Sequence, residues 1–308
     1  MRVIFMGTTP FSCVVLNTLI KNGYDLVAVV TQPDRPFGRK KILKASPVKE
    51  MAIEHGIPVL QPEKIREDYQ EILDYKPDLV VTCAYGQIVP KIVLDYPKHL
   101  CLNVHASLLP KYRGGAPIHW SIIKGDDETG VTLMRMDPGM DSGGMLSSRS
   151  VTIEQDDIMS DVEAKLMAAS IPLIEEDLPK YLQGDLKFVE QDEDKVTLAY
   201  TIQREDEFIS FDRPVKDVYN HIRGLISWPV GFARLNDQNI KLHGSSMIVK
   251  DHKHKPGEVV AMDEVGIHVA CQGGYIILTK IQPAGKPAMA AGDAINGIAQ
   301  DWKGQVFQ

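Results

Sequence analysis

Short apolar runs alternate with amphipathic helical patterns along the first half of the chain. Runs such as RVIFMG are apolar on both faces, which is typical of strands buried inside a parallel sheet. The stretches between them repeat apolar residues at helical spacing, and each of the three predicted helices closes with a glycine. The pattern predicts strands at residues 2–7, 26–32, 78–86, 101–110 and 130–137, and helices at residues 8–23, 48–56 and 161–184. The expected fold is an α/β domain with a doubly wound, Rossmann-like parallel sheet, and a loop is expected from Pro33 to Pro47.

The last hundred residues show a different pattern, in which short alternating segments are separated by glycine turns. These segments are residues 231–235, 240–249, 257–262, 266–272 and 274–283. Five short strands at this spacing predict a small β-barrel of the OB-like kind. We therefore expect an α/β domain at 1–184, an acidic linker at 185–204 and a C-terminal barrel at 205–308.

Composition agrees with an ordinary globular protein of two domains. The 308 residues are 44% hydrophobic and 24% charged. No apolar run reaches the roughly 18 to 20 residues that span a bilayer, and MRVIFMG is too short for a signal peptide. The four cysteines form no C-x-x-C pair, which favours buried free thiols in a reducing compartment. A cytoplasmic protein is expected.

The net charge of −7 does not exclude a polyanionic partner, because the acidic residues are concentrated in one segment. Residues 150–208 hold 16 Asp and Glu against 5 Lys and Arg. The segments on either side each have a small positive balance. Either end of the chain would therefore be compatible with a nucleic acid.

Two common kinds of site are excluded by their missing residues. The loop GTTPFS follows a predicted strand and opens a helix, but it has one glycine where a dinucleotide-binding turn needs three. The HKH sequence at residues 252–254 has no Cys or carboxylate companions at metal spacing, so a solvated turn is expected there. No metal site is expected.

The candidate chemistry lies where the strand CLNVH ends. Asn103 and His105 are two residues apart on a strand, so their side chains share one face of the sheet. The next predicted strand is followed by MDPGMDSGG, which places Asp141 in a glycine-rich loop expected at the same edge. An amide, an imidazole and a carboxylate together would suit acyl transfer, with two groups to stabilise an oxyanion and one to handle a proton.

These residues resemble those of the folate-dependent formyltransferases. The resemblance is carried by N-x-H-x-S-L-L-P, continued as HASLLPKYRGGAPIHW, and by the later D-x-G-M-D-S-G-G. It extends through TQPDRPFGRKKILKASPVK, TLAYTIQREDEFISFDRP and IRGLISWPVGF to IQPAGKPAMAAGDAING, nearly the whole chain. The family usually has GTPxFA where this chain has residues 7–12, and NPWPGA where it has residues 226–231.

The resemblance implies transfer of a formyl group from 10-formyltetrahydrofolate to the α-amine of methionyl-tRNA, the reaction that serves translation initiation. Asn103 and His105 would then stabilise the oxyanion, and Asp141 would hold His105 and pass on the proton of the amine. The residues implied at the folate site are Ser107, Leu108, Leu109, Pro110, Gln87, Ile88 and Val89, the last three through their backbone. Ser107 is not expected to act as a nucleophile.

The loop RPFGRKKILK carries five positive charges and no acidic residue. The resemblance implies that it contacts the acceptor end of initiator methionyl-tRNA, and the C-terminal barrel is implied as a second tRNA-binding part. The residues expected to contact tRNA are Arg35, Arg39, Lys40 and Lys41, with Arg39 as the main contact. The chain is expected to act as a monomer.

Two alternatives stay open. A formyltransferase acting on an amino sugar nucleotide would share Asn103, His105 and Asp141, but a second Arg would be expected at Gly115. A non-catalytic RNA-binding relative would use the barrel and would have no reason to keep those three residues.

Overall fold

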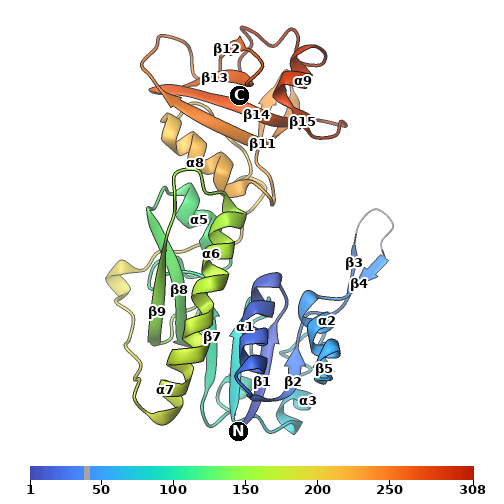
Figure 1. The fold of residues 1–308 in the computed structure, drawn as a ribbon, viewed down its shortest axis with the longest axis vertical. Helices are drawn as coiled ribbons and strands as arrows, with labels where there is room; N and C mark the ends of the chain where they lie inside the picture. The colour runs from blue at the N-terminus through green and yellow to red at the C-terminus, as the bar shows by residue number, and fades with distance from the viewer. Residues whose placement is uncertain (38–41) are drawn as a thin grey trace. The chain divides into compact units, whose positions relative to one another are not determined.

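The computed structural model describes residues 1–37 and 42–308, which form two compact units. Each unit is assembled from three segments of the chain (Figure 1). The N-terminal unit consists of Met1–Gly114, Thr129–Val151 and Glu163–Leu198, and the C-terminal unit consists of Gly115–Glu128, Thr152–Val162 and Ala199–Gln308. The chain therefore passes back and forth between the units before it ends in the second.

The N-terminal unit is built on a seven-stranded sheet with the order β5-β2-β1-β6-β7-β8-β9. Its strands are β1 Arg2–Gly7, β2 Asp25–Val30, β5 Val59–Leu60, β6 Leu79–Cys83, β7 Cys101–His105, β8 Glu128–Arg135 and β9 Met145–Thr152, and a separate hairpin pairs β3 Arg35–Phe37 with β4 Ile42–Lys44. Its helices are α1 Pro10–Lys21, α2 Pro47–Glu54, α3 Gln70–Asp74, α4 Lys91–Leu94, α6 Met159–Pro172, a π-helical turn Leu173–Asp177, α7 Leu178–Gln183 and a 3-10 turn Glu193–Lys195.

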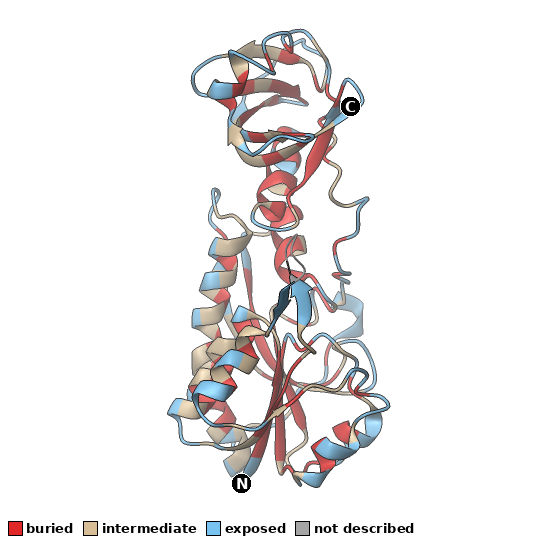
Figure 2. Cartoon of the chain, turned by 90° about the vertical axis from the view of Figure 1, so that its right-hand side faces the viewer, coloured by how far each residue is buried: buried red, intermediate tan, exposed pale blue. Residues whose placement is uncertain are grey.

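The central strands form because their side chains are apolar on both faces. Val3 to Met6 of β1 have no exposed surface, and β1 pairs in parallel with β2 on one side and β6 on the other. Figure 2 shows the same burial along the strands in the middle of the sheet. The helix after β1 begins at a capping box, in which Thr9 accepts from the Ser12 amide and the Ser12 hydroxyl accepts from the Thr9 amide. The predicted Rossmann-like architecture is confirmed.

This unit differs in several details from the sequence prediction, which omits β5, α3 and α4 and gives one unbroken helix at 161–184 where the structure has α6, the π-helical turn and α7. The strand predicted at 130–137 is β8, but it runs antiparallel to β7, so the sheet is only predominantly parallel. The prediction omits the edge strand β9, because residues 145–152 lack an apolar run and only Leu146 among them is buried. The loop expected from Pro33 to Pro47 contains the β3–β4 hairpin.

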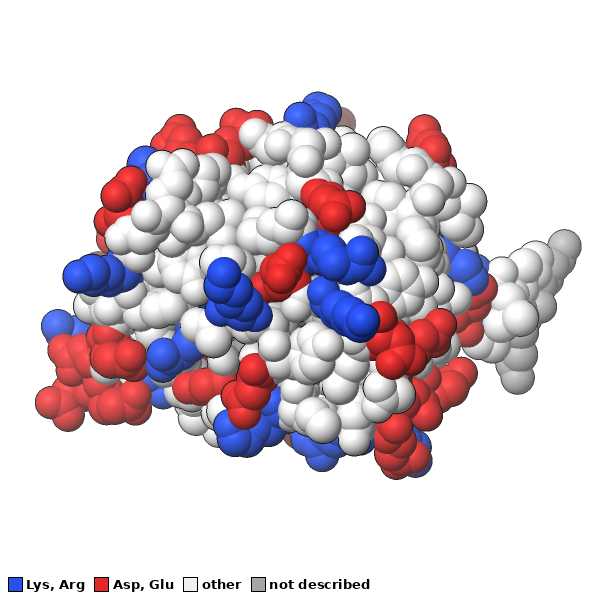
Figure 3. All heavy atoms as spheres, turned by 90° about the horizontal axis from the view of Figure 1, so that it is seen from below, with Lys and Arg blue, Asp and Glu red and all other residues white. Residues whose placement is uncertain are grey.

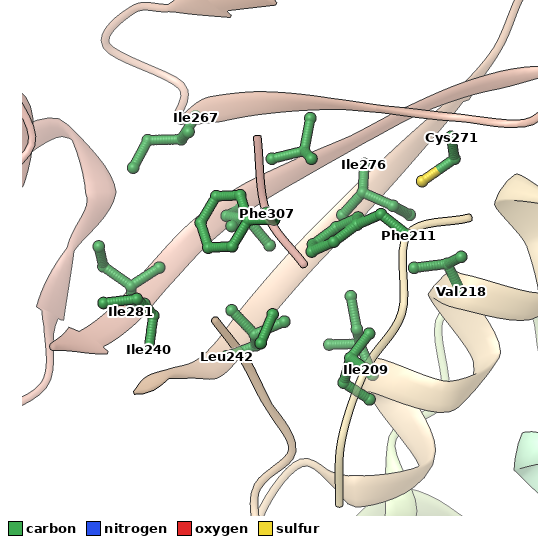
Figure 4. Packing of buried hydrophobic residues seen from close by; sticks show 14 of the residues in the cluster. Ile209, Phe211, Val218, Ile240, Leu242, Ile267, Cys271, Ile276, Ile281 and Phe307 are labelled. Atoms are coloured by element: carbon green, nitrogen blue, oxygen red, sulfur yellow. The ribbon is translucent and has the colours of Figure 1, made fainter. Parts of the chain in front are cut away.

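The C-terminal unit has an antiparallel sheet with the order β10-β11-β14-β13-β12, and β15 pairs with β14. Its elements are α5 Pro117–Ile123, α8 Val215–Leu225, β10 Phe232–Leu235, β11 Gln238–Val249, β12 Val259–Met262, β13 Ile267–Cys271, β14 Gly274–Pro283, β15 Met289–Ala290 and α9 Ala291–Ile295. All five predicted strands are present, and the sheet curls as a half-barrel around an apolar core that includes Phe211, Leu242, Ile276 and Phe307 (Figure 4). The helix α8 was not predicted, although it packs on this sheet.

The segment predicted as a linker has bridges to the N-terminal unit. Val189 pairs with Met145, and Leu198 pairs with Arg113. The boundaries predicted at residues 184 and 205 stay a prediction. The four cysteines are free thiols; Cys83, Cys101 and Cys271 are buried, as the sequence predicts, whereas Cys13 is only partly buried. Among the described residues, none of the helices combines the length and the apolar character that a membrane span requires.

Positive and negative side chains are interspersed on the face shown in Figure 3. Viewed from below, Lys and Arg alternate with Asp and Glu over the face of the molecule (Figure 3). An interspersed pattern gives no field of one sign. This face therefore offers no electrostatic preference for a polyanion.

Candidate active site

The strand β7 and the loop after β8 bring together the three residues that the sequence singles out. Oδ2 of Asp141 lies 3.6 Å from Nδ1 of His105, two residues beyond Asn103 on β7. The reason is not the shared strand edge that the sequence suggested. Because β8 is antiparallel to β7, its end at Arg135 lies opposite Leu102, and the following loop turns back to reach His105.

The Asp141 carboxylate is held by a backbone amide of the loop after β7. Its Oδ2 accepts a hydrogen bond of 2.9 Å from the backbone N–H of Gly114, in the loop after β7. Asp141 itself has a φ of +49°, a left-handed conformation that a residue with a side chain adopts only when its surroundings support it. Its side chain is 22% exposed and the His105 side chain 7%, so the pair is shielded but not sealed.

His105 has an oxygen on the side of each ring nitrogen, but only the one at Nε2 is at hydrogen-bond distance. Its Nε2 lies 3.0 Å from the carbonyl oxygen of Tyr112. A carbonyl only accepts, so this nitrogen carries a proton. Nδ1 is then the ring nitrogen on the side of Asp141, where a carboxylate can orient the ring.

The amide of Asn103 is oriented by the neighbouring strand. Thr82 lies opposite Asn103 in the parallel register of β6 and β7, and its hydroxyl donates to Oδ1 of Asn103 at 2.8 Å. Because the amide oxygen is used as the acceptor, the NH₂ group points away from Thr82 and keeps its donors for a ligand. A sequence without an alignment gives no reason to single out Thr82, whose only mark is a hydroxyl in the apolar strand LVVTC.

The residues expected at the folate site have mixed environments. Ser107 is fully buried and its hydroxyl donates to the backbone carbonyl of Lys111, which supports the expectation that it is not a nucleophile. Leu109 is buried, and Leu108 and Pro110 are half-buried. These four residues belong to the loop that directly follows His105.

In the second expected folate segment, residues 87–89, the side chain of Gln87 binds the protein backbone and is not available to a ligand. Gln87 accepts from the Ile65 amide at 2.9 Å and donates to the Pro62 carbonyl at 3.1 Å. Val89 is buried, whereas Ile88 is 66% exposed. With the Gln87 amide occupied, contact with a ligand through the backbone remains the simplest interpretation of this segment.

The basic loop is described only at its ends. Arg35 is exposed and reaches Oε1 of Gln32 at 3.4 Å, so its guanidinium remains on the surface. Arg39, Lys40 and Lys41, which the sequence predicts as tRNA contacts, lie outside the described residues.

Other chemistries find little support at this site. Cys83 ends the strand next to β7, but burial raises the pKa of its thiol to about 12, so it is not a nucleophile near neutral pH. Among the described His, Cys, Asp and Glu residues, no cluster is arranged to hold a metal ion. His252 of the HKH sequence, in an irregular segment, contacts the carbonyls of Cys271 and Gly274 at 2.8 and 2.9 Å.

A Rossmann-like sheet with an amide, an imidazole and a carboxylate at one site is an arrangement suited to acyl transfer. Comparison with known families gives the same class. Residues 1–175 match the formyl transferase family, and residues 201–299 match the formyl transferase C-terminal domain. The chain belongs to the formyl transferase family.

Individual relatives extend this similarity over nearly the whole chain. It is 49% identical over 299 residues to a methionyl-tRNA formyltransferase of Bacillus subtilis, covering 96% of this chain and 94% of the relative. Among solved structures, an N-formyltransferase of Helicobacter canadensis in complex with folinic acid and dTDP-3-aminofucose has a TM-score of 0.69 at 18% identity, covering 92% of this chain and 99% of that chain. A methionyl-tRNA formyltransferase of Clostridium thermocellum has a TM-score of 0.56 at 17% identity, covering 80% of this chain and 94% of that chain. At these identities the two structures support the fold alone.

Proposed function

We propose that this chain transfers a formyl group from 10-formyltetrahydrofolate to the α-amine of methionyl-tRNA. The observation that carries the proposal is the near-full-length identity of 49% with the Bacillus subtilis methionyl-tRNA formyltransferase. The geometry of Asn103, His105 and Asp141 supplies groups that the reaction needs. We expect the protein to act as a monomer in the cytoplasm.

The nucleophile needs little activation. An α-amine has a pKa of about 7.7 to 8.0, so an appreciable neutral fraction is present near pH 7. Attack of its nitrogen on the formyl carbon forms a C–N bond and a tetrahedral oxyanion. The NH₂ group of Asn103, turned away from Thr82, is the donor for that oxyanion. A protonated His105 is the second donor, through its Nδ1–H, because its Nε2–H is used by the Tyr112 carbonyl and Nδ1 lies 3.6 Å from Asp141, beyond hydrogen-bond distance.

Collapse of the tetrahedral species needs one proton to move. The bond between the formyl carbon and N10 of the folate breaks, the amine nitrogen loses a proton, and N10 gains one. Asp141 orients His105 and, through a water molecule, relays this proton. The partial exposure of the carboxylate, 22% of its side chain, is compatible with such a water.

Folate would lie against the loop after β7 and the segment after β6. The first contributes Ser107, Leu108, Leu109 and Pro110, and the second contributes the backbone of residues 87–89. The Helicobacter canadensis N-formyltransferase, which has this fold, holds folinic acid, a folate derivative.

The tRNA would be held by two parts of the chain. The basic loop, with Arg35, Arg39, Lys40 and Lys41, would contact the acceptor end of initiator methionyl-tRNA. The C-terminal unit would provide a second tRNA-binding part. The divided contact would explain why the similarity to tRNA-specific relatives extends through both units.

A direct assay decides between this function and its alternatives. The protein is incubated with 10-formyltetrahydrofolate and either charged initiator tRNA or a UDP-amino sugar, and the formylated product is measured. We expect product only with the tRNA. Formylation of the sugar nucleotide alone would establish the alternative enzyme, and binding of RNA without turnover on either acceptor would establish the non-catalytic alternative.

A further inference from the structure

One buried amide contacts both loops that carry the candidate site. The Nε2 atom of Gln191 donates to the backbone carbonyl oxygens of Asp141 at 2.7 Å and Gly143 at 2.8 Å. Its Oε1 accepts from Nε of Arg113 at 2.9 Å. The residue is only 8% exposed, although it lies in an acidic stretch where the sequence predicts a linker. Both donors and the acceptor of the amide are therefore in use.

The Arg113 end of this contact leads directly to the reacting groups. The residue before Arg113 is Tyr112, whose carbonyl meets Nε2 of His105, and the residue after it is Gly114, whose N–H meets the Asp141 carboxylate. Arg113 is 6% exposed. Its guanidinium donates to the Glu193 carboxylate at 2.8 and 3.3 Å. The short segment that contains Gln191 and Glu193 thus binds the 112–114 loop through the Arg113 side chain.

The same segment grips this loop a second time through its backbone. The Arg113 N–H donates to the Thr197 carbonyl at 2.9 Å, and the Tyr112 N–H donates to the Thr197 hydroxyl at 2.9 Å. Unlike the contacts made by Glu193 and Thr197, the side-chain amide of Gln191 also binds the loop that contains Asp141. It therefore connects the two loops whose separation sets the distance from His105 to Asp141.

We propose that Gln191 is a positioning residue for formyl transfer, which holds the Asp141 loop against the 112–114 loop. The expected change in kcat rests on the proposed function. The placement of the Asp141 loop by Gln191 rests only on the hydrogen bonds. Asp141 has a left-handed backbone, so its placement needs outside support, and Gln191 binds its carbonyl. A carboxylate displaced by about 1 Å would no longer orient His105, and misplacement of that size can cost about 10²-fold in rate.

Two substitutions separate positioning from simple stabilisation. Gln191→Glu keeps the shape and the acceptor for Arg113, but places an acceptor where two carbonyls need a donor. Gln191→Met keeps the length and removes every hydrogen bond. The matched control is Gln203→Glu, because Gln203 is exposed and its amide serves only a local contact with the Thr201 carbonyl among the described residues.

The test combines steady-state kinetics with amide hydrogen exchange in the full-length protein. Both Gln191 variants should lower kcat by about 10- to 10²-fold while the KM values for folate and tRNA stay within about threefold. The Gly114 N–H, which the Asp141 carboxylate protects, should exchange faster without any substrate present. Gln203→Glu should match the wild type in both measurements.

Each other result is informative. Normal kcat and unchanged Gly114 exchange in either folded variant would overturn the proposal. A lower Tm with normal kcat at a temperature where the variant is folded would reduce Gln191 to a stabilising residue and also overturn it. If neither variant folds, Glu193→Gln is used instead, because it weakens the ion pair of Arg113 at an exposed residue. It should accelerate the exchange of the Gly114 N–H to a smaller extent. An inactive wild type would instead count against the proposed function, and the exchange measurement would still decide the role of Gln191.

Discussion

The hydroxyl of Thr82 donates to the amide oxygen of Asn103 across two parallel strands, at 2.8 Å. With the hydroxyl donating to this oxygen, the NH₂ end of the Asn103 amide faces away from Thr82; the same hydroxyl also lies 3.2 Å from the Leu102 carbonyl and 3.1 Å from Sδ of Met136. A rotation of the amide by half a turn would present an oxygen to the developing oxyanion and would be repulsive. The register of β6 and β7 therefore determines the chemical character of the site.

Replacing Asn103 tests the oxyanion donor. Asn103→Ala should lower kcat by about 10²–10³-fold, because one preorganised donor is lost from the transition state. The KM values should change little, since the donor acts mainly after attack. Single-turnover kinetics with charged tRNA measure the effect. Turnover close to the wild type would remove Asn103 from the assignment.

Replacing Thr82 tests the orientation of that donor. Thr82→Val removes the hydroxyl at nearly constant volume, so the Asn103 amide can turn, and kcat should fall by about 10-fold or more. Thr82→Ser keeps the hydroxyl and is the matched control. The prediction fails if the Val and Ser variants have the same kcat.

His105 and Asp141 should behave as a unit. His105→Ala and Asp141→Asn should each cost about 10²-fold or more in kcat, and the double variant should lose less than the product of the two. Asp141→Asn retains an acceptor for the Gly114 N–H, so the loop should stay folded. Asp137→Asn is the control, because Asp137 accepts from Gly139 and Ser142 within the same loop. Fully multiplicative losses would show that the two residues act independently.

The basic loop should affect tRNA and leave folate alone. Arg39→Ala should raise the KM for charged tRNA without changing the KM for folate, because a guanidinium both pairs with phosphate and stacks on bases. Lys41→Ala should reduce the log–log slope of tRNA affinity against salt by about 0.7–0.9 for one lost phosphate contact. Lys64→Ala, at an exposed lysine paired with Glu67, is the control. Equal damage to both KM values would mean that the loop supports the fold.

Acidification should destabilise the protein through His221. Burial, followed by the positive charge of Arg213, lowers the pKa of this imidazole below its ordinary value of 6.5. Its Nε2 donates to the Asp206 carbonyl and its Nδ1 accepts from Arg213, so the neutral ring is the form that fits. As the pH falls below 6.5, the unfolded state takes up a proton that the folded state refuses, and the free energy of unfolding falls by up to about 1.4 kcal/mol per pH unit.

Thermal unfolding between pH 7.5 and pH 5.5 measures this dependence. His221→Gln should lower Tm at neutral pH and flatten its fall towards acid, since Gln does not titrate. His55→Gln, at an exposed position, is the control. A His221→Gln variant with the same pH dependence as the wild type would show that other groups cause the acid loss.

The sequence predicts the centre of the fold better than its edges. The inner strands are uniformly apolar because both faces are covered, and their pattern gives both their place and their type. The direction of β8 leaves no such mark, since an antiparallel strand in a covered sheet is equally apolar. In contrast, α8 had a usable signal, because its buried Val215, Val218 and Ile222 have helical spacing.

The candidate site divides in the same way. The sequence could single out Asn103, His105 and Asp141, because the type of each residue by itself indicates a chemical role. Thr82 and Gln191 could not, because their importance comes from the register of two strands and from the return of a distant segment. A lone Gln between acidic residues has nothing in its sequence neighbourhood to distinguish it from a solvated surface.

The assignment of α5 to the C-terminal unit has a consequence for biosynthesis. This helix follows the HASLLPKYRGGAP stretch in the sequence, yet it packs on α8, about one hundred residues later. During translation at ~5–20 residues per second, α5 leaves the ribosome roughly 5–20 s before its partner. Over that interval Ile123 and the partly buried Trp120, which pack in the same apolar cluster as the α8 residues, have no native surface to cover them. A nascent chain stalled between the two helices would present these apolar side chains to chaperones.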